Sequence, residues 1–146
     1  MLKLAGVKAG DTVYDLGCGD GRIVIMAAEK FGAKGVGVEL DDELFAQTNQ
    51  RVKDLHLEDK VRIIHGDLME VDLSPATVVT LYLLPSSNIK VRPNLEMYLK
   101  KGSRVVSHDF EIAGWKTSKT EQMETEDFGR VHTLFLYRLG EQEEKK

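Results

Sequence analysis

The chain has 146 residues, of which 42% are hydrophobic and 30% are charged, and this length suits a single domain with a buried core. The net charge of −4 argues against the basic face that nucleic-acid binding usually requires. The single cysteine, Cys18, excludes a disulfide framework, and no Cys/His group has the spacing of a zinc site, so no metal is expected. No apolar run is long enough to cross a membrane. We therefore expect a cytoplasmic monomer or weak dimer, with one domain over residues 1–140 and a polar tail over 141–146.

Strand and helix patterns alternate along most of the chain. In chain order, they predict a strand at 12–16, a helix at 21–31, a strand at 34–40, a helix at about 41–57, strands at 61–65 and 77–84, a helix at 88–99 and a strand at 103–110. Residues 121–125 and 131–137 then alternate around an Asp-Phe-Gly-Arg turn, which is typical of a β-hairpin. The pattern predicts a doubly wound α/β domain, with a mostly parallel sheet and a C-terminal antiparallel hairpin.

The most informative stretch is VYDLGCGDGR at residues 13–22. Three glycines lie between the predicted strand and the predicted helix: Gly17, Gly19 and Gly21. Glycines at such a junction allow a sharp turn and let a ligand approach the amides at the start of the helix. A dinucleotide fingerprint, G-x-G-x-x-G, would need glycine at position 22, which is Arg22. Asp15 on the preceding strand instead suits a ligand with a cationic group.

Two further acidic residues end predicted strands. Glu39 closes the second strand, where a carboxylate can accept hydrogen bonds from both hydroxyls of a ribose. Asp67 follows the third strand, where it could accept a hydrogen bond from an adenine amino group. Either acid alone could be an ordinary polar strand terminus. Three acids at the carboxyl ends of three successive strands indicate one binding site.

These residues resemble the cofactor motifs of class I S-adenosylmethionine-dependent methyltransferases, whose Rossmann-like sheet also ends in an antiparallel hairpin. The resemblance implies that Asp15 and the backbone of Gly17, Cys18 and Gly19 bind the methionine moiety. It further implies ribose binding by Glu39 and adenine contacts from Leu40, Asp67 and Leu68. The bound cofactor would be S-adenosylmethionine, and the product S-adenosylhomocysteine.

Within that class, the segments GDGRIVIMAA and GVGVEL look most like the small protein-lysine methyltransferases of archaea and mitochondria. The mitochondrial members of that group modify a membrane subunit of ATP synthase and the adenine nucleotide translocase. The resemblance implies N-methylation of lysine side chains in a protein substrate. Members usually carry an extra N-terminal segment over the cofactor, whereas only eleven residues precede the first predicted strand here.

The acceptor should lie over the ends of the fourth and fifth predicted strands. An Asn/Asp-Pro-Pro-aromatic sequence, frequent in methyltransferases of base amines and planar amides, is replaced by LYLLP. Tyr82 and Asp109 are the predicted catalytic residues, because a hydroxyl and a carboxylate could position an amine and His108 could accept its proton. Phe110 and Trp115 could enclose an alkyl chain. The alternatives are core packing for Tyr82, a hydrogen-bonded structural role for His108, and simple lid packing for Phe110 and Trp115.

The remaining chemistry-bearing residues have simpler expected roles. Arg22 places a cation in the first turn of a helix, against the helix dipole. It is expected either to pair with Asp20 or Asp109 and shape the pocket, or to be a solvated surface residue. Cys18 is expected to be a small loop residue, since no base lies beside it in the sequence. His65 and His132 are expected to fill strand positions.

Three other functions remain open from the sequence. One is methylation of a small molecule, although the lack of a large insertion favours a protein acceptor. Another is a non-catalytic module that binds S-adenosylmethionine and regulates a partner. A nicotinamide dehydrogenase is disfavoured by Arg22 and by the absence of a substrate domain.

Overall fold

The structure, a computed structural model, describes residues 1–124 and 131–142. Its elements are β1 (Thr12–Leu16), α1 (Arg22–Phe31), β2 (Lys34–Glu39), α2 (Asp42–Asp54), β3 (Val61–His65), the short 3₁₀ turn η1 (Leu68–Glu70), β4 (Val78–Leu81), α3 (Pro85–Tyr98), β5 (Arg104–His108), β6 (Lys119–Glu124) and β7 (Val131–Arg138). In this part of the chain, seven strands form one sheet in the order β3-β2-β1-β4-β5-β7-β6. The predicted Asp-Phe-Gly-Arg turn at 127–130 and the end of the predicted tail, 143–146, lie outside the described residues.

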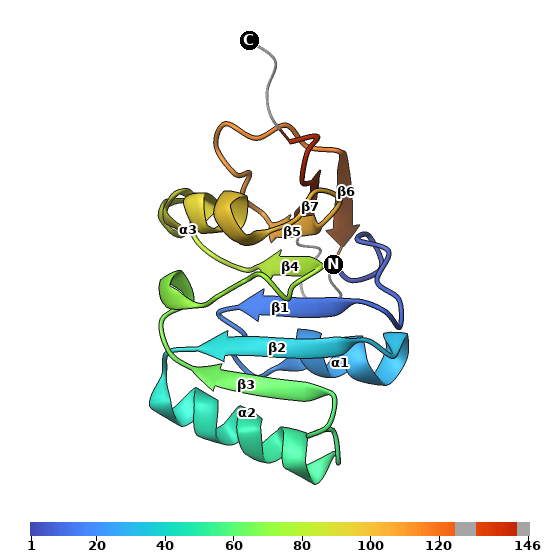
Figure 1. Cartoon of the computed structure of the whole chain (residues 1–146), viewed down its shortest axis with the longest axis vertical. Helices are drawn as coiled ribbons and strands as arrows, with labels where there is room; N and C mark the ends of the chain where they lie inside the picture. Colours follow the sequence, from blue (N-terminus) through green and yellow to red (C-terminus); the bar gives the residue numbers. More distant parts are fainter. Residues whose placement is uncertain (125–130, 143–146) are drawn as a thin grey trace.

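The sheet confirms the predicted fold class. Strands β1 to β5 pair in parallel, and β7 runs antiparallel between β5 and β6. The chain builds the sheet outward from β1 to β3 and then returns to the other side of β1 with β4. In Figure 1 the arrowheads of β1 to β4 all point to one edge of the sheet. The reversal between β1 and β4 is the position where sheets of this kind bind ligands.

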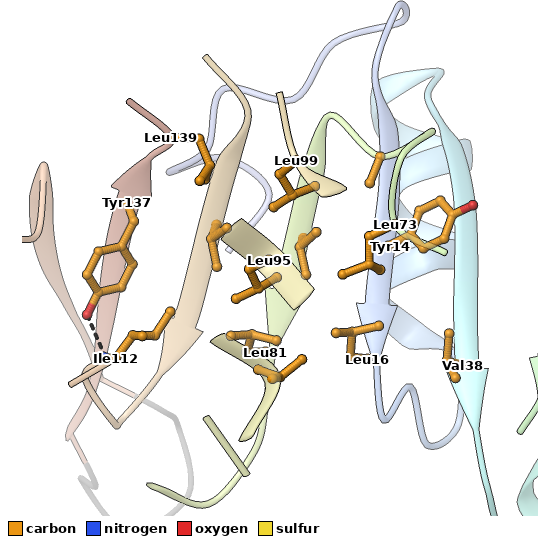
Figure 2. Close-up of a cluster of buried hydrophobic side chains, with 14 of the residues drawn as sticks. Tyr14, Leu16, Val38, Leu73, Leu81, Leu95, Leu99, Ile112, Tyr137 and Leu139 are labelled. Carbon is orange, nitrogen blue, oxygen red and sulfur yellow. Dashed lines mark hydrogen bonds between the residues drawn. The ribbon is translucent and has the colours of Figure 1, made fainter. Parts of the chain in front are cut away.

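Side chains of β1 alternate between two hydrophobic layers. Val13 packs with Ala27 of α1 and with Val78, on the face that also buries Leu2, Ala5 and Val7 of the N-terminal segment. Tyr14 and Leu16 point to the opposite face, where they pack with Leu95 of α3 (Figure 2). Because strand side chains alternate, Asp15 falls on the same face as Val13.

The segment after β5 covers part of the α3 face without forming a helix. Ile112 and Trp115 are buried there, and the Ile112 amide donates a 2.8 Å hydrogen bond to the Tyr137 hydroxyl (Figure 2). The Trp115 indole N–H donates to Glu96 on α3 at 2.9 Å. Trp115 is therefore a core residue, and its predicted contact with the acceptor is replaced by packing against Tyr137.

The boundaries of β4 and α3 differ from the prediction. The strand ends at Leu81, and α3 begins at Pro85, three residues earlier than expected. Proline at the first helical position has a suitable φ and lacks an N–H that would be unpaired there anyway. The predicted strand over 77–84 thus includes a loop, and this loop carries Tyr82 out of the sheet at its carboxyl edge.

Candidate functional site

The glycine loop turns sharply at the end of β1. The amides of Gly17 and Cys18 both donate to the carbonyl of Val38 on β2, each at 2.9 Å. Gly17, Gly19 and Gly21 have φ values of 76°, 55° and 78°, in the left-handed region that favours glycine. The loop is anchored from the other side by Thr48 of α2, whose hydroxyl donates to the Gly19 carbonyl at 2.7 Å.

Asp15 is a buried carboxylate beneath this loop. Its side chain is on the α1 face, the residue is 2% exposed, and Oδ1 accepts a 2.8 Å hydrogen bond from the Thr80 hydroxyl. Within residues 1–124 and 131–142, no Lys, Arg or His side chain forms an ion pair with it. Burial raises the pKa of Asp15 to about 7, against the lowering effect of the Thr80 hydroxyl. A carboxylate in this state is suited to a cationic partner.

A cavity of about 330 Å³ opens beside Asp15. It is lined by four of the predicted cofactor residues and by four others: Asp15, Gly17, Cys18, Gly19, Asp20, Arg22, Ile23 and Tyr82. A side chain at Gly19 would meet no atom within 4 Å, so the backbone of the loop faces open space. The predicted methionine-binding residues are thus brought together around one cavity.

Glu39 connects the end of β2 to the glycine loop. Its Oε1 accepts from the Gly19 amide at 2.9 Å, and its Oε2 accepts from the Asp41 amide at 3.0 Å. These bonds hold the carboxylate at the carboxyl edge, beside the loop. Leu40 follows and is 67% exposed, which leaves an apolar surface free to contact a ligand.

Asp67 and Leu68 lie at the same edge but outside the first cavity. Asp67 is exposed and accepts a 2.9 Å hydrogen bond from the Met69 amide, which caps the η1 turn. Leu68 is partly buried against the core. His65 does not fill an interior position of the strand, because it pairs with Asp42 at 2.7 Å and stacks on Phe45 at the surface.

A second cavity, of about 400 Å³, lies over the ends of β4 and β5. Its lining includes both predicted catalytic residues: Tyr82, Leu83, Leu84, His108, Asp109 and Phe110. Tyr82 also lines the first cavity, so its side chain is a wall common to both. The Tyr82 side chain is open to solvent, with 60% of the residue exposed.

Asp109 is the most constrained residue of the second cavity. It has a φ of 64°, which is uncommon for a residue other than glycine. Its Oδ1 accepts from the Thr133 amide at 3.0 Å, and its Oδ2 lies 3.3 Å from His132 Nδ1 and 3.6 Å from His108 Nδ1. Burial would raise the pKa of Asp109, but the Thr133 amide and the two imidazoles lower it below its usual value. The carboxyl group is therefore ionised at neutral pH.

The comparisons with known proteins agree with this geometry. Residues 15–119 match the ANTKMT methyltransferase domain. The chain belongs to this methyltransferase family. A protein-lysine N-methyltransferase of Saccharolobus islandicus (strain REY15A) is 46% identical over 142 residues, which are 97% of this chain and 87% of that protein. A human lysine N-methyltransferase, named for its action on ATP synthase, is 30% identical over 79% of this chain and 48% of that protein.

A solved structure extends the agreement to the whole fold. The crystal structure of an RNA methyltransferase from Salinibacter ruber in complex with S-adenosyl-L-homocysteine matches with a TM-score of 0.88 and 45% identity, over 99% of this chain and 90% of that chain. The resemblance to class I methyltransferases is therefore confirmed, and the protein is a methyltransferase enzyme.

Arg22 and Cys18, in and beside the glycine loop, have contacts that agree with their expected roles. Arg22 pairs with Asp20 at 2.9 Å, which settles its predicted choice between Asp20 and Asp109. Burial, with help from the charges of Asp15 and Glu39, raises the pKa of the Cys18 thiol to about 12. A thiol that stays protonated is a poor nucleophile.

Two residues of the acceptor side escaped the sequence analysis. His132, expected to fill a strand, lies against Asp109. Asn88 is fully buried in the first turn of α3 and donates to Ser107 Oγ at 3.2 Å and to the Phe110 carbonyl at 3.4 Å. These contacts fix the turn that presents Asp109. Only the polarity of Asn88 on the buried face of a helix could have signalled its role.

The sequence contains no apolar run long enough to cross a membrane, and the helices of the structure can be compared with that observation. Within residues 1–124 and 131–142, no helix combines the length and the apolar character needed to span a bilayer.

Proposed function

We propose that this methyltransferase uses S-adenosylmethionine to methylate lysine side chains of a protein substrate. The observation that carries the proposal is the pair of cavities that meet at Tyr82, one beside the glycine loop and one beside Asp109. A donor in the first cavity and an amine in the second would be adjacent. The names of two relatives, both lysine N-methyltransferases, support lysine as the acceptor.

The residues of the first cavity fit this cofactor. S-adenosylmethionine supplies a methyl group on a positively charged sulfur and carries an ammonium group as well. Asp15, buried and without a cationic partner among the described residues, would attract that ammonium group. The open backbone at Gly17, Cys18 and Gly19 would accommodate the methionine chain.

The nucleoside would extend along the carboxyl edge of the sheet. Glu39, at the end of β2, would accept the ribose hydroxyls, in keeping with the usual place of that carboxylate. Leu40 and Leu68 would contact the faces of the adenine, and Asp67 would accept from its amino group. The hydrogen bonds that the Gly19 and Asp41 amides donate to Glu39 keep its carboxylate at the carboxyl edge of the sheet, as this role requires.

The second cavity suits the long alkyl chain of lysine. Leu84 and Phe110 are exposed apolar side chains that line it. An apolar mouth lowers the pKa of a lysine amine by desolvation, which helps it lose the proton that it carries at neutral pH. Tyr82 and Asp109 are the catalytic residues in this proposal: the hydroxyl and the carboxylate orient the amine toward the methyl group. Alignment of the two reactants supplies most of the rate gain, and no metal is required.

RNA is the second candidate acceptor, because a solved relative with 45% identity is described as an RNA methyltransferase. The net charge of −4 favours a protein acceptor. We also propose that the enzyme acts in the cytoplasm, off the membrane, as a monomer or weak dimer of one domain.

The test uses S-adenosylmethionine with a radiolabelled methyl group and separate fractions of a cell lysate. We expect label in protein, recovered as methyl-lysine after acid hydrolysis, and loss of that label with Glu39→Ala. Calorimetry with S-adenosylhomocysteine should show micromolar binding to the wild type and none to Glu39→Ala, while Glu39→Gln, which keeps the shape, should bind weakly. Label that ribonuclease removes would instead identify RNA as the acceptor. Transfer unimpaired in both Tyr82→Phe and Asp109→Asn would contradict their catalytic roles.

A further inference from the structure

Three aromatic rings stand in series at the wall between the two cavities. The Tyr82 and His108 rings stack with centroids 4.1 Å apart and an angle of 18° between their planes. The His108 and His132 rings follow at 4.7 Å and 35°. The two histidine side chains are only 12% and 11% exposed, in contrast to Tyr82. The exposed tyrosine therefore rests on a largely buried support.

The antiparallel direction of β7 explains how His132 reaches this place. The parallel strands arrive at the site with their carboxyl ends, whereas β7 arrives with its first residues. The Asp109 amide donates to the Thr133 carbonyl at 2.7 Å, and the Thr133 amide donates back to Asp109 Oδ1. This pairing places His132 beside the Asp109 carboxylate.

We propose that His132 is a positioning residue of the acceptor site, which holds Asp109 and the His108 ring so that Tyr82 is fixed between cofactor and amine. The inference rests on the proposed function and deepens it. Asp109 is held by one backbone amide and lies between two imidazoles, in a backbone conformation that is rare for aspartate. Without the His132 imidazole, the carboxylate that also contacts the His108 ring loses the donor on its other side.

The expected consequence is a loss of alignment at the reacting atoms. Methyl transfer requires the amine and the methyl group to be held in line, and small displacements reduce the rate strongly. Tyr82 is 60% exposed and its ring stacks on His108, so we expect this packing to restrain the ring. His132 lines neither cavity, and its removal should therefore act on the rate and leave cofactor binding intact.

A bound divalent ion is the competing explanation for this cluster. One ligand atom each from His108, Asp109 and His132 lie within 4.8 Å of one another, and two histidines with a carboxylate are a common metal-binding set. Our inference does not involve an ion, so the assay includes EDTA, which would remove one.

The experiment compares His132→Leu with His132→Asn. Asparagine places an amide nitrogen near the position of the imidazole Nδ1 and can still donate to Asp109, whereas leucine cannot. Arg138→Gln, at the exposed far end of β7, is the matched control. We measure kcat and KM with poly-L-lysine as acceptor, and the Kd of S-adenosylhomocysteine by calorimetry.

His132→Leu should lower kcat about tenfold, with the Kd of S-adenosylhomocysteine unchanged within about twofold. His132→Asn should recover most of the rate, and Arg138→Gln should match the wild type. Equal loss in the leucine and asparagine variants, or no loss in either, overturns the inference. So does weakened cofactor binding in His132→Leu, or a wild-type activity that EDTA removes and zinc restores.

A structural measurement separates this inference from the proposed function. Tyrosine ring carbons are labelled with ¹³C, and the Tyr82 signal is assigned by its absence in Tyr82→Phe. In the complex with S-adenosylhomocysteine, His132→Leu should shift the Tyr82 ring signal, and His132→Asn should leave it near the wild-type position. The acceptor is tested separately, by recovery of methyl-lysine from lysate protein, and this result decides the role of His132 even if poly-L-lysine is not methylated. An unmoved Tyr82 signal in His132→Leu overturns the inference whatever the activity.

Discussion

Asp15 occupies a position where the alternation of β1 would otherwise place an apolar side chain. It lies on the face of Val13, beneath α1, and is 2% exposed. Burying a carboxylate without a cationic partner is unfavourable, and the pKa of about 7 expresses that cost as partial protonation. The fold is therefore less stable than it would be without this carboxyl group, which lines the first cavity.

Cofactor binding should depend on the protonation of Asp15. Below pH 7 the carboxyl group is mostly neutral and cannot attract the ligand ammonium group, so affinity falls as the pH falls. If only the ionised form binds, the Kd of S-adenosylhomocysteine should rise about tenfold between pH 8 and pH 6, as measured by calorimetry.

Asp15→Asn is the control for this pH dependence. It should bind the ligand weakly at both pH values, without the trend. The folded-state pKa of Asp15 lies above its ordinary value of 3.8, so its ionisation destabilises the fold as the pH rises from about 4 toward 7 and beyond. Asp15→Asn should accordingly unfold at a higher temperature than the wild type at pH 8. An unchanged melting temperature would mean that the carboxylate is already stabilised in the unliganded protein.

At the scale of single residues, the sequence anticipated several residues that line each cavity, but it did not anticipate the residues that support the second cavity from behind. Asp15 and Glu39 were recognisable because local signals, a strand end and a neighbouring glycine loop, surround them. His132 was missed because its partner Asp109 lies 23 residues away and is reached only through strand pairing. A histidine in an alternating strand looks like any other strand residue until the neighbouring strand is known.

At the scale of elements, the glycine loop depends on α2 as much as on β1 and α1. Gly21 has a φ of 78°, and a Cβ atom there would lie 2.5 Å from Thr48 Cγ2. Thr48 in turn holds the Gly19 carbonyl. One residue of α2 therefore limits the space at Gly21 and also donates one of the hydrogen bonds that hold the loop.

Gly21→Ala should destabilise the protein by about 2–3 kcal/mol, because it combines left-handed strain with a close contact. Urea unfolding would measure the loss. Gly6→Ala is the matched control, because Gly6 has a φ of 68° but no atom lies within 4 Å of a Cβ there; it keeps the left-handed strain without the contact and should cost only about 1–2 kcal/mol. Similar losses in both variants would show that the close approach to Thr48 does not matter.

The order and type of the elements followed from the sequence, whereas some boundaries did not. Hydrophobic periodicity identified every strand up to β5 and the three helices between them. The segment LYLLPSSN was assigned partly to a strand, because apolar residues continue past Leu81 although the chain has already left the sheet. Those side chains line the second cavity, so the wall of a cavity resembled a core strand in the sequence.

At the scale of the whole molecule, the site and the main polar anchor lie at opposite edges of the sheet. Asp11 precedes β1 and Arg104 begins β5, and the two form a largely buried ion pair at the amino ends of the strands. Arg104 also donates to the Ala5 carbonyl at 2.8 Å, and the Thr77 hydroxyl donates to Asp11 at 2.8 Å. The pair ties the N-terminal segment to the middle of the sheet.

Arg104→Met should lower the free energy of unfolding by about 3–5 kcal/mol, because Asp11 would remain buried without its cation. The Kd of S-adenosylhomocysteine should stay the same at a temperature where the variant is folded. Arg138→Met, which changes the exposed register partner of Arg104, should have little effect on either quantity. A changed Kd in Arg104→Met would show that the two edges communicate.

The pKa of Asp11 determines how the stabilisation from its ion pair with Arg104 depends on pH. Burial would raise this pKa, but hydrogen bonds from Thr77, the Lys8 amide and Arg104 lower it below 3.8. Its contribution to stability is therefore complete above about pH 4 and is lost as the pH falls through the lowered value, so the anchor should resist mild acid.

Tyr82 lines both cavities, so we expect ligands in the two cavities to affect each other's affinity through this shared side chain. Any ligand that presses the ring toward one position changes the space on its other side. If bound S-adenosylhomocysteine changes the affinity for a lysine peptide by some factor, the bound peptide must change the affinity for S-adenosylhomocysteine by the same factor. A single aromatic side chain would then couple the binding of the two substrates on either side of it, equally in both directions.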